Sequence, residues 1–275
     1  MTDASLDPLI RLMAERPFAV LTGAGISTAS GIPDYRDKDG IRRGKAPMMI
    51  GEFLGSAAAR RRYWARAMLG WPRVRQARPN AAHQALAALQ QAGRISGVIT
   101  QNVDTLHSQA GSEHVIELHG SLHWVVCLDC RHRLPRDDLQ VLLETQNPHF
   151  ADIEAVQAPD GDTLLDPAWE AGFTVPRCPM CQGDRLKPDV VFFGENVAPA
   201  TAAHAAERVL EAPGLLVVGS SLMAYSAFRL CKAVAEADKP LLAINQGTTR
   251  ADALLQVKLQ APCVDVLQSL ASRLL

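Results

Sequence analysis

The chain has 275 residues, of which 48% are hydrophobic and 21% are charged, as in an ordinary globular protein. This length suits one large domain or one domain with a smaller insert. Lysine and arginine number 28 against 29 for aspartate and glutamate, which gives a net charge of −1. A chain so close to neutral lacks the basic excess of a nucleic-acid-binding protein, so we expect no nucleic-acid partner.

The N-terminal sequence MTDASLDPLIRLMAERP shows no targeting pattern. It lacks the basic and then apolar segments of a secretory signal, and it is not the acid-poor, arginine- and serine-rich sequence of a transit peptide. No apolar run approaches the ~20 residues of a membrane span. We therefore expect a cytoplasmic protein without a membrane partner.

Short apolar runs alternate with helical patterns along most of the chain. Several runs are rich in valine and isoleucine and lack polar alternation, as buried parallel strands do. The runs predict strands at 18–22, 95–100, 115–118, 190–193, 215–219, 241–245 and 263–267. Helices are expected at 83–91, 198–212 and 226–237. This alternation predicts an α/β fold with a Rossmann-like, doubly wound parallel sheet.

Residues 37–79 interrupt the alternation, because they lack strand patterns and are rich in arginine and alanine. They predict a helical insert, in which the stretch RRRYWARAMLGWP (60–72) is a helix that stops at Gly-Trp-Pro. Tyr63 and Arg66 lie three residues apart and so share one face of this helix. From these residues alone, that face either packs and is solvated or binds an anion.

Cysteines mark a second interruption, at 123–184. Four of the six cysteines form two Cys-x-x-Cys pairs, Cys127 with Cys130 and Cys178 with Cys181. In a chain without an export signal, this pattern favours a metal site over disulfides. Four thiolates leave no open position on a tetrahedral ion, so we predict one structural zinc ion. Cys263 is expected to begin a strand as a core residue.

Small and polar residues follow the predicted strands, where parallel sheets bind ligands. Gly23-Ala24-Gly25-Ile26-Ser27 follows the first strand. A Gly-x-Gly turn lets backbone amides approach a pyrophosphate, although a plain tight turn is as good an interpretation of these residues alone. Gly219-Ser220-Ser221 and Asn245 follow two later strands and suit phosphate or ribose, but such residues are also common turn formers.

Two further strand ends carry groups capable of chemistry. Gln101-Asn102-Val103-Asp104 follows the second strand, and we interpret these side chains as ligand contacts rather than as a surface loop. His119 comes directly after a buried type of strand, and Gly120 beside it gives room. A histidine in this position could act as a general base near neutral pH.

Taken together, these motifs resemble those of the sirtuins, the NAD-dependent protein lysine deacylases. The matching segments follow the family order and are GAGISTASGIPDYR (23–36), TQNVDTLH (100–107), ELHGS (117–121), CLDC, CPMC, LKPDVVFFGE (186–195), VVGSSL (217–222) and IN (244–245). The phrases YWARxxxGWP, PDGD and TTRAD and the long gap between the cysteine pairs look like the mitochondrial sirtuin-four branch, which belongs to class II or lies close to it.

The resemblance implies one catalytic domain over residues 1–275, built from two parts. The large, Rossmann-type part would comprise 1–36, 80–122 and 185–275. The small part would combine the helical insert, 37–79, with the zinc module, 123–184. NAD and an acyl-lysine protein substrate would meet in the cleft between them.

The resemblance also implies roles for individual residues. His119 would be the general base, with Asn102 and Asp104 as further catalytic residues. NAD would contact Gly23, Ala24, Gly25, Ser27, Tyr35, Arg36, Gln101, Asn102, Asp104, Gly219, Ser220, Ser221, Asn245 and Cys263. The substrate peptide would add as a strand beside Val191, Phe192, Gly194 and Glu195.

The implied reaction releases nicotinamide and transfers the acyl group from lysine to ADP-ribose. In class II sirtuins that remove acidic acyl groups, a Tyr-x-x-Arg pair binds the acyl carboxylate, and Tyr63 and Arg66 match that spacing. We therefore expect a preference for succinyl-, glutaryl- or hydroxymethylglutaryl-lysine. Alternatives left open are mono-ADP-ribosyl transfer or lipoamide hydrolysis at the same site, and an NAD-sensing interaction module without turnover. The oligomeric state is also left open.

Overall fold

The computed structural model describes residues 6–14, 16–34, 37, 39, 41–44, 46–150, 153, 156–157 and 163–275. The chain divides into two compact units, each of which is described by itself. Unit 1 comprises Met1–Arg43, Ala77–His119 and Val197–Leu275, and unit 2 comprises Gly44–Gln76 and Gly120–Asn196.

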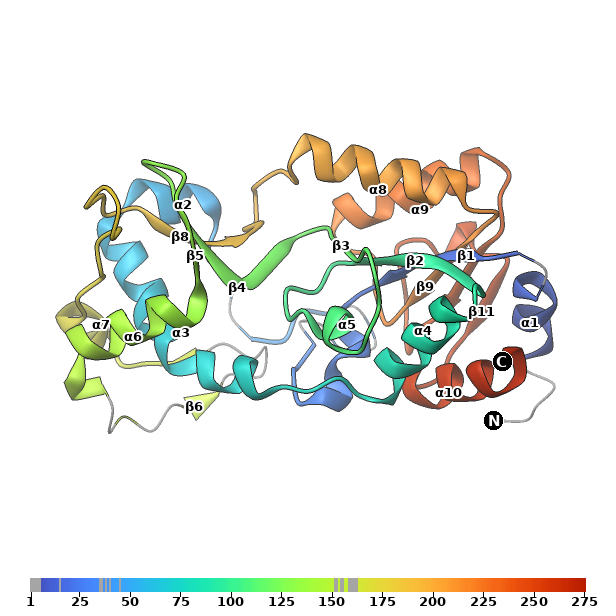
Figure 1. The fold of residues 1–275 in the computed structure, drawn as a ribbon, viewed down its shortest axis with the longest axis horizontal. Coiled ribbons are helices and arrows are strands. Elements are labelled where there is room, and N and C mark those ends of the chain that lie inside the picture. The colour runs from blue at the N-terminus through green and yellow to red at the C-terminus, as the bar shows by residue number, and fades with distance from the viewer. Residues whose placement is uncertain are drawn as a thin grey trace. The chain divides into compact units, whose positions relative to one another are not determined.

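Unit 1 is built on a parallel sheet, six-stranded over the described residues, in the order β11-β10-β9-β1-β2-β3 (Figure 1). The strands are β1 (Phe18–Thr22), β2 (Ile95–Thr100), β3 (Ile116–Glu117), β9 (Leu215–Val218), β10 (Leu241–Ile244) and β11 (Val257–Leu259). Strand β1 lies between β2 and β9, so the chain moves from it toward both edges of the sheet. Such a reversal of strand order is where open α/β sheets bind ligands.

Alternating side chains on the strands form a core on each face of this sheet. Phe18 and Val20 of β1 join one hydrophobic cluster, while Ala19 and Leu21 join the other. Helices α1 (Asp7–Met13), α4 (Ala81–Gln91) and α10 (Cys263–Leu274) cover the first face, and α8 (Pro199–Glu211) and α9 (Tyr225–Glu236) cover the second (Figure 1). Short helical segments are η2 (Ala24–Ile26), η3 (Thr28–Ser30), α5 (Leu106–Gln109) and η5 (Asp252–Leu254).

This architecture confirms the predicted Rossmann-like fold and the helices predicted at 83–91, 198–212 and 226–237, but the strand predicted at 263–267 is wrong. Residues 263–267 form the start of α10, not a strand. Cys263, Val266, Leu267 and Leu270 are all buried at helical spacing, which a five-residue window is too short to reveal. The outer strand is instead β11, a three-residue strand whose side chains are only partly buried and whose sequence signal is correspondingly weak.

Unit 2 combines helices with a small antiparallel sheet in the order β5-β4-β8. Its core includes Trp64, Val125, Leu139, Phe150 and Leu186. The helical elements are α2 (Ile50–Gly55), α3 (Ala57–Gln76), α6 (Arg136–Gln146), η4 (Pro148–Phe150) and α7 (Pro167–Gly172). The strands are β4 (Gly120–Cys127), β5 (Arg133–Pro135), β8 (Leu186–Val190) and the separate pair β6 (Val156–Gln157) and β7 (Thr163–Leu164).

Residues 37–43 and 77–79 belong to unit 1 rather than to the predicted helical insert, and residues 120–122 and 185–196 belong to unit 2 rather than to the predicted Rossmann-type part. The reason for the second difference is the antiparallel pairing of β4 with β8, which joins residues 120–122 and 185–196 next to the cysteine pairs.

None of the helices in the described part of the chain has both the length and the apolar character needed to cross a bilayer.

Helix α3 continues through Gly70-Trp71-Pro72, so the predicted stop at this sequence is wrong. A proline has no N–H for the carbonyl four residues before it, here that of Met68. The side chain of Gln140 donates to that carbonyl at 3.0 Å, and Arg136 donates to the neighbouring carbonyl of Ala67 at 3.0 Å. Both donors come from α6, so a tertiary contact supplies what the helix itself lacks.

Candidate functional site

The polar residues that follow β1 and β2 form one buried hydrogen-bonded cluster in unit 1. The Ser27 hydroxyl donates to the Asp104 carboxylate at 2.7 Å and accepts from the Asn102 amide at 3.0 Å. The Asn102 amide also donates to the Gly23 carbonyl at 3.1 Å. Ser27, Asn102 and Asp104 are all buried. The structure therefore brings together residues that the sequence could place only at separate strand ends.

The loop after β9 joins this cluster through Gln101. Its amide donates to the Ser220 hydroxyl at 2.8 Å and to the Thr22 carbonyl at 3.1 Å. Ser221 accepts at its carbonyl from the Arg250 N–H, at 2.9 Å. These bonds fix the spacing of three adjacent strand ends at the switch point of the sheet.

Close packing of glycines explains the Gly-x-Gly turn. A Cβ on Gly23 would lie 2.7 Å from the Cβ of Ser220, and one on Gly25 would lie 2.9 Å from the Gly219 carbonyl oxygen. The N–H groups of Gly23 and Gly25 donate to the carbonyls of Val218 and Gly219 at 3.0 and 2.9 Å. These two amides are thus paired within the protein, and the glycines serve the close contact of two loops.

Asn245 and Cys263 lie around the carboxyl end of β10. The Asn245 amide donates to the Gly247 carbonyl at 3.2 Å. Cys263, at the start of α10, packs next to Gly219, where a Cβ would lie 3.1 Å from the cysteine sulfur. Ala24 belongs to η2, beside the glycines. Tyr35 and Arg36 lie outside the described residues.

The residues present in unit 1 fit a dinucleotide. Buried hydroxyl, amide and carboxylate groups converge at the carboxyl ends of parallel strands, where phosphates and riboses are held in this type of sheet. Any Cβ on Gly23 or Gly25 would push apart the loops that carry these groups. The fit rests on this set of donors and acceptors and on the position of the cluster in the sheet.

His119 follows β3 with both ring nitrogens engaged. Nδ1 lies 3.0 Å from the Gln101 carbonyl oxygen, which can only accept, so Nδ1 carries the proton. Nε2 is then the basic nitrogen, and it lies 2.8 Å from the Ser226 hydroxyl, which donates to it. Burial lowers the pKa of His119 below its usual value, while the Gln101 bond partly offsets the effect. The imidazole is thus a neutral base with its lone pair on Nε2.

Two more histidines, His83 and His107, are buried behind the cluster with their rings 4.8 Å apart. The Thr22 hydroxyl donates to Thr100 at 2.8 Å, so His107 Nε2, 2.9 Å away, must donate to Thr22. Thr100 in turn accepts from the Asn102 N–H at 3.1 Å. The chain of bonds therefore links His107 to the backbone of Asn102.

In this pair, each ring has one nitrogen with no hydrogen-bond partner among the described residues, His83 Nε2 and His107 Nδ1. His83 Nδ1 accepts from the Asn80 N–H at 3.3 Å, as part of the capping box of α4, so Nε2 is its N–H nitrogen. The pKa of His83 falls to about 4, mainly by burial, with Asp104 acting in the opposite direction. The pKa of His107 falls to about 3, by burial and by its proximity to His83.

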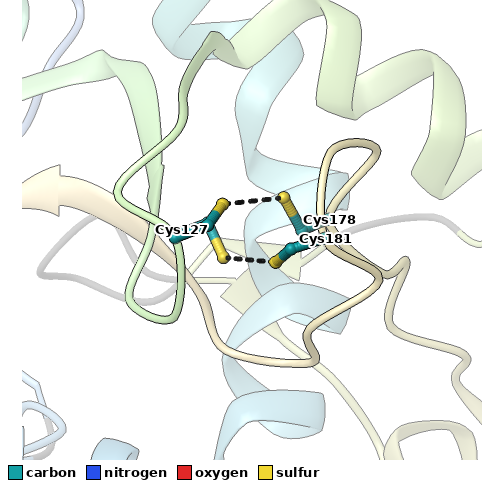
Figure 2. A group of neighbouring side chains, drawn as sticks. Cys127, Cys178 and Cys181 are labelled. Atoms are coloured by element: carbon teal, nitrogen blue, oxygen red, sulfur yellow. Dashed lines mark hydrogen bonds between the residues drawn. The ribbon is translucent and has the colours of Figure 1, made fainter.

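The four predicted metal ligands meet in unit 2, with all four sulfur atoms within 4.8 Å of one another. Figure 2 shows side chains of the two Cys-x-x-Cys segments facing each other. The Sγ atoms of Cys127 and Cys181 are 3.6 Å apart, and those of Cys130 and Cys178 are 3.7 Å apart. Four sulfurs around a tetrahedral zinc ion at about 2.3 Å would lie about 3.8 Å from one another. The cluster is compatible with a closed, structural zinc site.

Both cysteine turns have the same backbone design. The N–H of Arg131 donates to the Cys127 carbonyl at 2.9 Å, and the N–H of Gln182 donates to the Cys178 carbonyl at 2.9 Å. Arg131 and Gln182 have φ values of 65° and 61°, the left-handed region that closes such turns. Local backbone geometry therefore points both pairs of thiols to one place.

The segment expected to flank a peptide comprises Val191, Phe192, Gly194 and Glu195. It leaves the sheet, since β8 ends at Val190, so the predicted strand at 190–193 is wrong beyond its first residue. The Glu195 N–H donates to the Phe192 carbonyl at 3.0 Å, and the Glu195 carboxylate accepts from the Phe192 N–H at 2.9 Å. Gly194 has a φ of 79°, which favours a turn over a strand. Contact with a peptide stays a prediction.

Tyr63 and Arg66 lie on one side of α3, as the spacing predicts. The Tyr63 ring packs against Phe53 and Phe192, with ring centroids 5.5 and 5.4 Å apart. Arg66 forms an ion pair with Glu170 of α7, in which Nε and Nη2 both lie 2.8 Å from one carboxylate oxygen. The guanidinium therefore does bind a carboxylate in this structure, and that carboxylate belongs to the chain itself.

Sequence reasoning missed three contributors to these sites. Ser226 is the second residue of α9, far along the chain from His119, and nothing in the local pattern marks it. His107 is the last residue of the segment TQNVDTLH, but the sequence does not indicate its contact with Thr22 behind the polar cluster. Glu170 lies on α7, in the long gap between the cysteine pairs, where the sequence carries no clear signal.

Comparison with known proteins identifies the family. The family model described as Sir2 family matches residues 23–226. A protein of Pseudomonas syringae pv. tomato named NAD-dependent protein deacetylase 3 is 67% identical over 270 residues, covering 98% of this chain and 96% of that protein. The chain belongs to the Sir2 family. Another relative, from Xanthomonas campestris pv. campestris and named NAD-dependent protein deacetylase, is 52% identical over 90% of this chain and 84% of that protein.

Solved structures of Sir2 enzymes agree with this assignment. One, described as the structural basis for the mechanism and regulation of Sir2 enzymes, has a TM-score of 0.77 and 30% identity over 99% of this chain and 98% of that one. Another, described as Sir2 with a p53 peptide and NAD+, has a TM-score of 0.75 and 30% identity over 98% of both chains. The predicted sirtuin membership is confirmed, whereas the narrower likeness to the sirtuin-four branch stays a prediction.

Proposed function

We propose that this Sir2 family protein is an NAD-dependent protein lysine deacylase, with His119 as its general base. The observation that carries the proposal is the neutral His119 imidazole, which holds its lone pair on Nε2. Its other nitrogen donates to the carbonyl of Gln101, and the Gln101 side chain donates to Ser220 of the neighbouring loop. The names of the Pseudomonas and Xanthomonas relatives, both NAD-dependent protein deacetylases, support the same activity.

When bound, NAD supplies a ribose carbon from which nicotinamide can leave, and its ribose hydroxyls supply the acceptor for the acyl group. His119 would take a proton from such a hydroxyl at Nε2, after Ser226 has released that nitrogen. The Gln101 carbonyl holds the opposite N–H and so keeps Nε2 basic. A correctly placed general base of this kind contributes ~10²–10⁴-fold to the rate.

Asn102 and Asp104 would bind the ribose and nicotinamide side of NAD. Their side chains are held by Ser27, so the loop after β1 and the loop after β2 are positioned together. Gly219, Ser220 and Ser221 would face the phosphates and the ribose. The four cysteines would hold one zinc ion, which shapes unit 2 and takes no part in the reaction because no coordination position is left open.

For the acyl group, we propose that Tyr63 and Arg66 bind the carboxylate of a succinyl, glutaryl or hydroxymethylglutaryl chain, as in class II sirtuins. Two features support this assignment. Arg66 presents Nε and Nη2 to a single carboxylate oxygen. Tyr63 packs against Phe192, in the segment proposed to flank the substrate peptide. A charge-assisted bond to such a carboxylate is worth about 1.5–3 kcal/mol.

The test is a panel of peptides that carry one acetyl-, succinyl-, glutaryl-, hydroxymethylglutaryl- or lipoyl-lysine, incubated with NAD and analysed by mass. We expect loss of the acyl group, release of nicotinamide and formation of O-acyl-ADP-ribose. His119→Ala should abolish turnover and leave NAD binding nearly unchanged. The matched control is His204→Ala, which changes an exposed histidine on α8.

Other outcomes of this panel would replace the proposal. Added ADP-ribose on a protein would mean mono-ADP-ribosyl transfer, and release of the lipoyl group alone would mean lipoamidase activity. Binding of NAD without any nicotinamide release would mean a sensing module. Removal of the acetyl group but of no acidic acyl group would support deacylase activity and would rule out the proposed role of Tyr63 and Arg66. A cytoplasmic location stays a prediction from the sequence.

A further inference from the structure

Arg66, the proposed binder of acyl carboxylates, already has a carboxylate partner in unit 2. One oxygen of Glu170 lies 2.8 Å from both Nε and Nη2 of Arg66. The side chains are 25% exposed for Arg66 and 12% exposed for Glu170, so water screens this pair only in part. The Glu170 carboxyl group thus occupies a place that the proposed function gives to the end of an acidic acyl chain.

The two partners belong to very different helices. Helix α3, which carries Arg66, is anchored in the core by Trp64, Ala65 and Met68. Helix α7, which carries Glu170, is only six residues long, and none of its described residues is buried.

Helix α7 is attached to its surroundings through its backbone and through Trp169. Besides the Arg66 pair, Arg61 donates to the Ala171 carbonyl at 3.0 Å, and Trp169 packs edge-on against Phe150 at 5.6 Å and stacks on His149 at 6.1 Å. Apart from the Arg66 pair, these contacts do not involve the Glu170 side chain. Its carboxylate can therefore leave Arg66 for solvent without disturbing the core. Arg66, by contrast, is fixed at its place on α3.

We propose that Glu170 is an internal competitor for Arg66 and so sets how strongly the enzyme prefers acidic over neutral acyl groups. This inference rests on the proposed function of Arg66. An acidic acyl chain has to displace Glu170 before it can pair with the guanidinium, whereas an acetyl group makes no such demand. Glu170 therefore weakens the binding of acidic substrates selectively and leaves acetyl substrates nearly unaffected.

Electrostatics fixes the direction of the effect. With Glu170 in place, the Arg66 guanidinium is already neutralised, and a second carboxylate nearby would be repelled by the first. Glu170→Gln removes the charge but keeps the shape and length of the side chain. A neutral amide competes less well for the guanidinium, because it lacks the Coulombic attraction of a carboxylate for the positive charge.

The experiment measures kcat and KM of wild type and Glu170→Gln for one peptide with acetyl-, succinyl- or glutaryl-lysine. We expect the KM for the two acidic groups to fall about tenfold, the KM for acetyl to change less than twofold, and kcat to stay constant. Glu170→Asp retains the charge on a side chain that is one methylene shorter, so the KM for the acidic groups should fall less than in Glu170→Gln. Glu52→Gln is the matched control, since it breaks the exposed ion pair between Glu52 of α2 and Arg62 of α3, the helix that carries Arg66, and should change no constant.

A double variant shows whether the effect passes through Arg66. In an Arg66→Gln background, Glu170→Gln should have no effect on acidic substrates, because the guanidinium for which Glu170 and the acyl carboxylate compete is absent. An effect that persists there would overturn the inference. So would a Glu170→Gln enzyme with unchanged selectivity, or with equal losses for acetyl and acidic peptides, which would make the pair purely structural.

Calorimetric titration with the same acyl peptides separates this inference from the proposed function. If wild type releases no nicotinamide from any peptide, the proposed activity fails. The selective tenfold gain in affinity of Glu170→Gln for acidic peptides can still be measured by binding alone. Its absence there would overturn the inference whatever the turnover.

Discussion

Acidification from pH 6.5 to pH 5 should destabilise unit 1, because His83 and His107 are buried as neutral rings. Their pKa values are about 4 and about 3 in the folded protein, against 6.5 for an ordinary histidine. In this pH range the unfolded chain takes up protons on both residues and the folded chain does not. Stability is therefore fully present above pH 6.5 and is lost as the pH falls toward the folded pKa values.

The size of the effect follows from the pKa shifts. One pKa unit corresponds to about 1.4 kcal/mol, so 1.5 pH units below 6.5 give about 2 kcal/mol for each histidine. Both histidines together should then lower the free energy of unfolding at pH 5 by about 4 kcal/mol relative to pH 8, and by about 3 kcal/mol relative to pH 6.5, where the unfolded histidines are already half protonated. The structural cause is that a second proton on His107 Nδ1 would find no acceptor among the described residues.

The assay has to follow unit 1 rather than unit 2. All four tryptophans lie in unit 2, so tryptophan fluorescence would report on the wrong part of the chain. Hydrogen exchange of the β1 and β2 amides, measured at pH 6.5 and 5.0 with correction for the intrinsic exchange rate, reports on the sheet next to His107. Urea unfolding followed by far-UV circular dichroism gives a second estimate.

His107→Gln separates the histidines from other titrating groups. The Gln amide can donate to Thr22 as His107 Nε2 does, but it does not titrate in this range. The variant should lose about half of the pH dependence. His204→Gln, on the exposed side of α8, should retain all of it. A pH dependence in His107→Gln equal to that of the wild type would refute the reasoning.

Two further predictions concern the zinc cluster and the general base. Chelation of zinc, or Cys127→Ser, should change the tryptophan fluorescence of unit 2, because Trp64 and Cys127 belong to one hydrophobic cluster; an unchanged spectrum after complete metal removal would contradict a structural role. Ser226→Ala removes a hydroxyl that favours the neutral form of His119, so the pKa of His119 should rise. The acid limb of kcat/KM against pH should then move to higher pH, and a limb that stays in place would show that Ser226 does not act on Nε2.

The sequence by itself determined five of the sheet strands, β1, β2, β3, β9 and β10, and the places of the ligand groups that follow them. Valine- and isoleucine-rich runs identify parallel strands, and the carboxyl ends of such strands lie along one edge of the sheet. Ser27, Asn102 and Asp104 could therefore be assigned to one region before their contacts were known. The two Cys-x-x-Cys pairs likewise specify a metal cluster through residue type and spacing.

Only the tertiary structure decided which partners the functional groups have. Ser226 and Gln101 fix the tautomer of His119, and Gln140 allows α3 to pass through Pro72. These partners lie far apart in the chain, so no local pattern records them. The Cys263 segment was wrongly predicted as a strand for a related reason, since a short apolar run suits either type of element until its packing is known.

Arg66 shows the same limit most clearly. Its spacing from Tyr63 predicts a shared helix face, and its charge predicts an anionic partner. Whether that partner is a substrate or Glu170 depends on where α7 packs against α3, which is set by side-chain contacts across more than a hundred residues of chain. Local periodicity determines secondary structure, whereas the pairing of distant charges is determined by the packing of the completed fold.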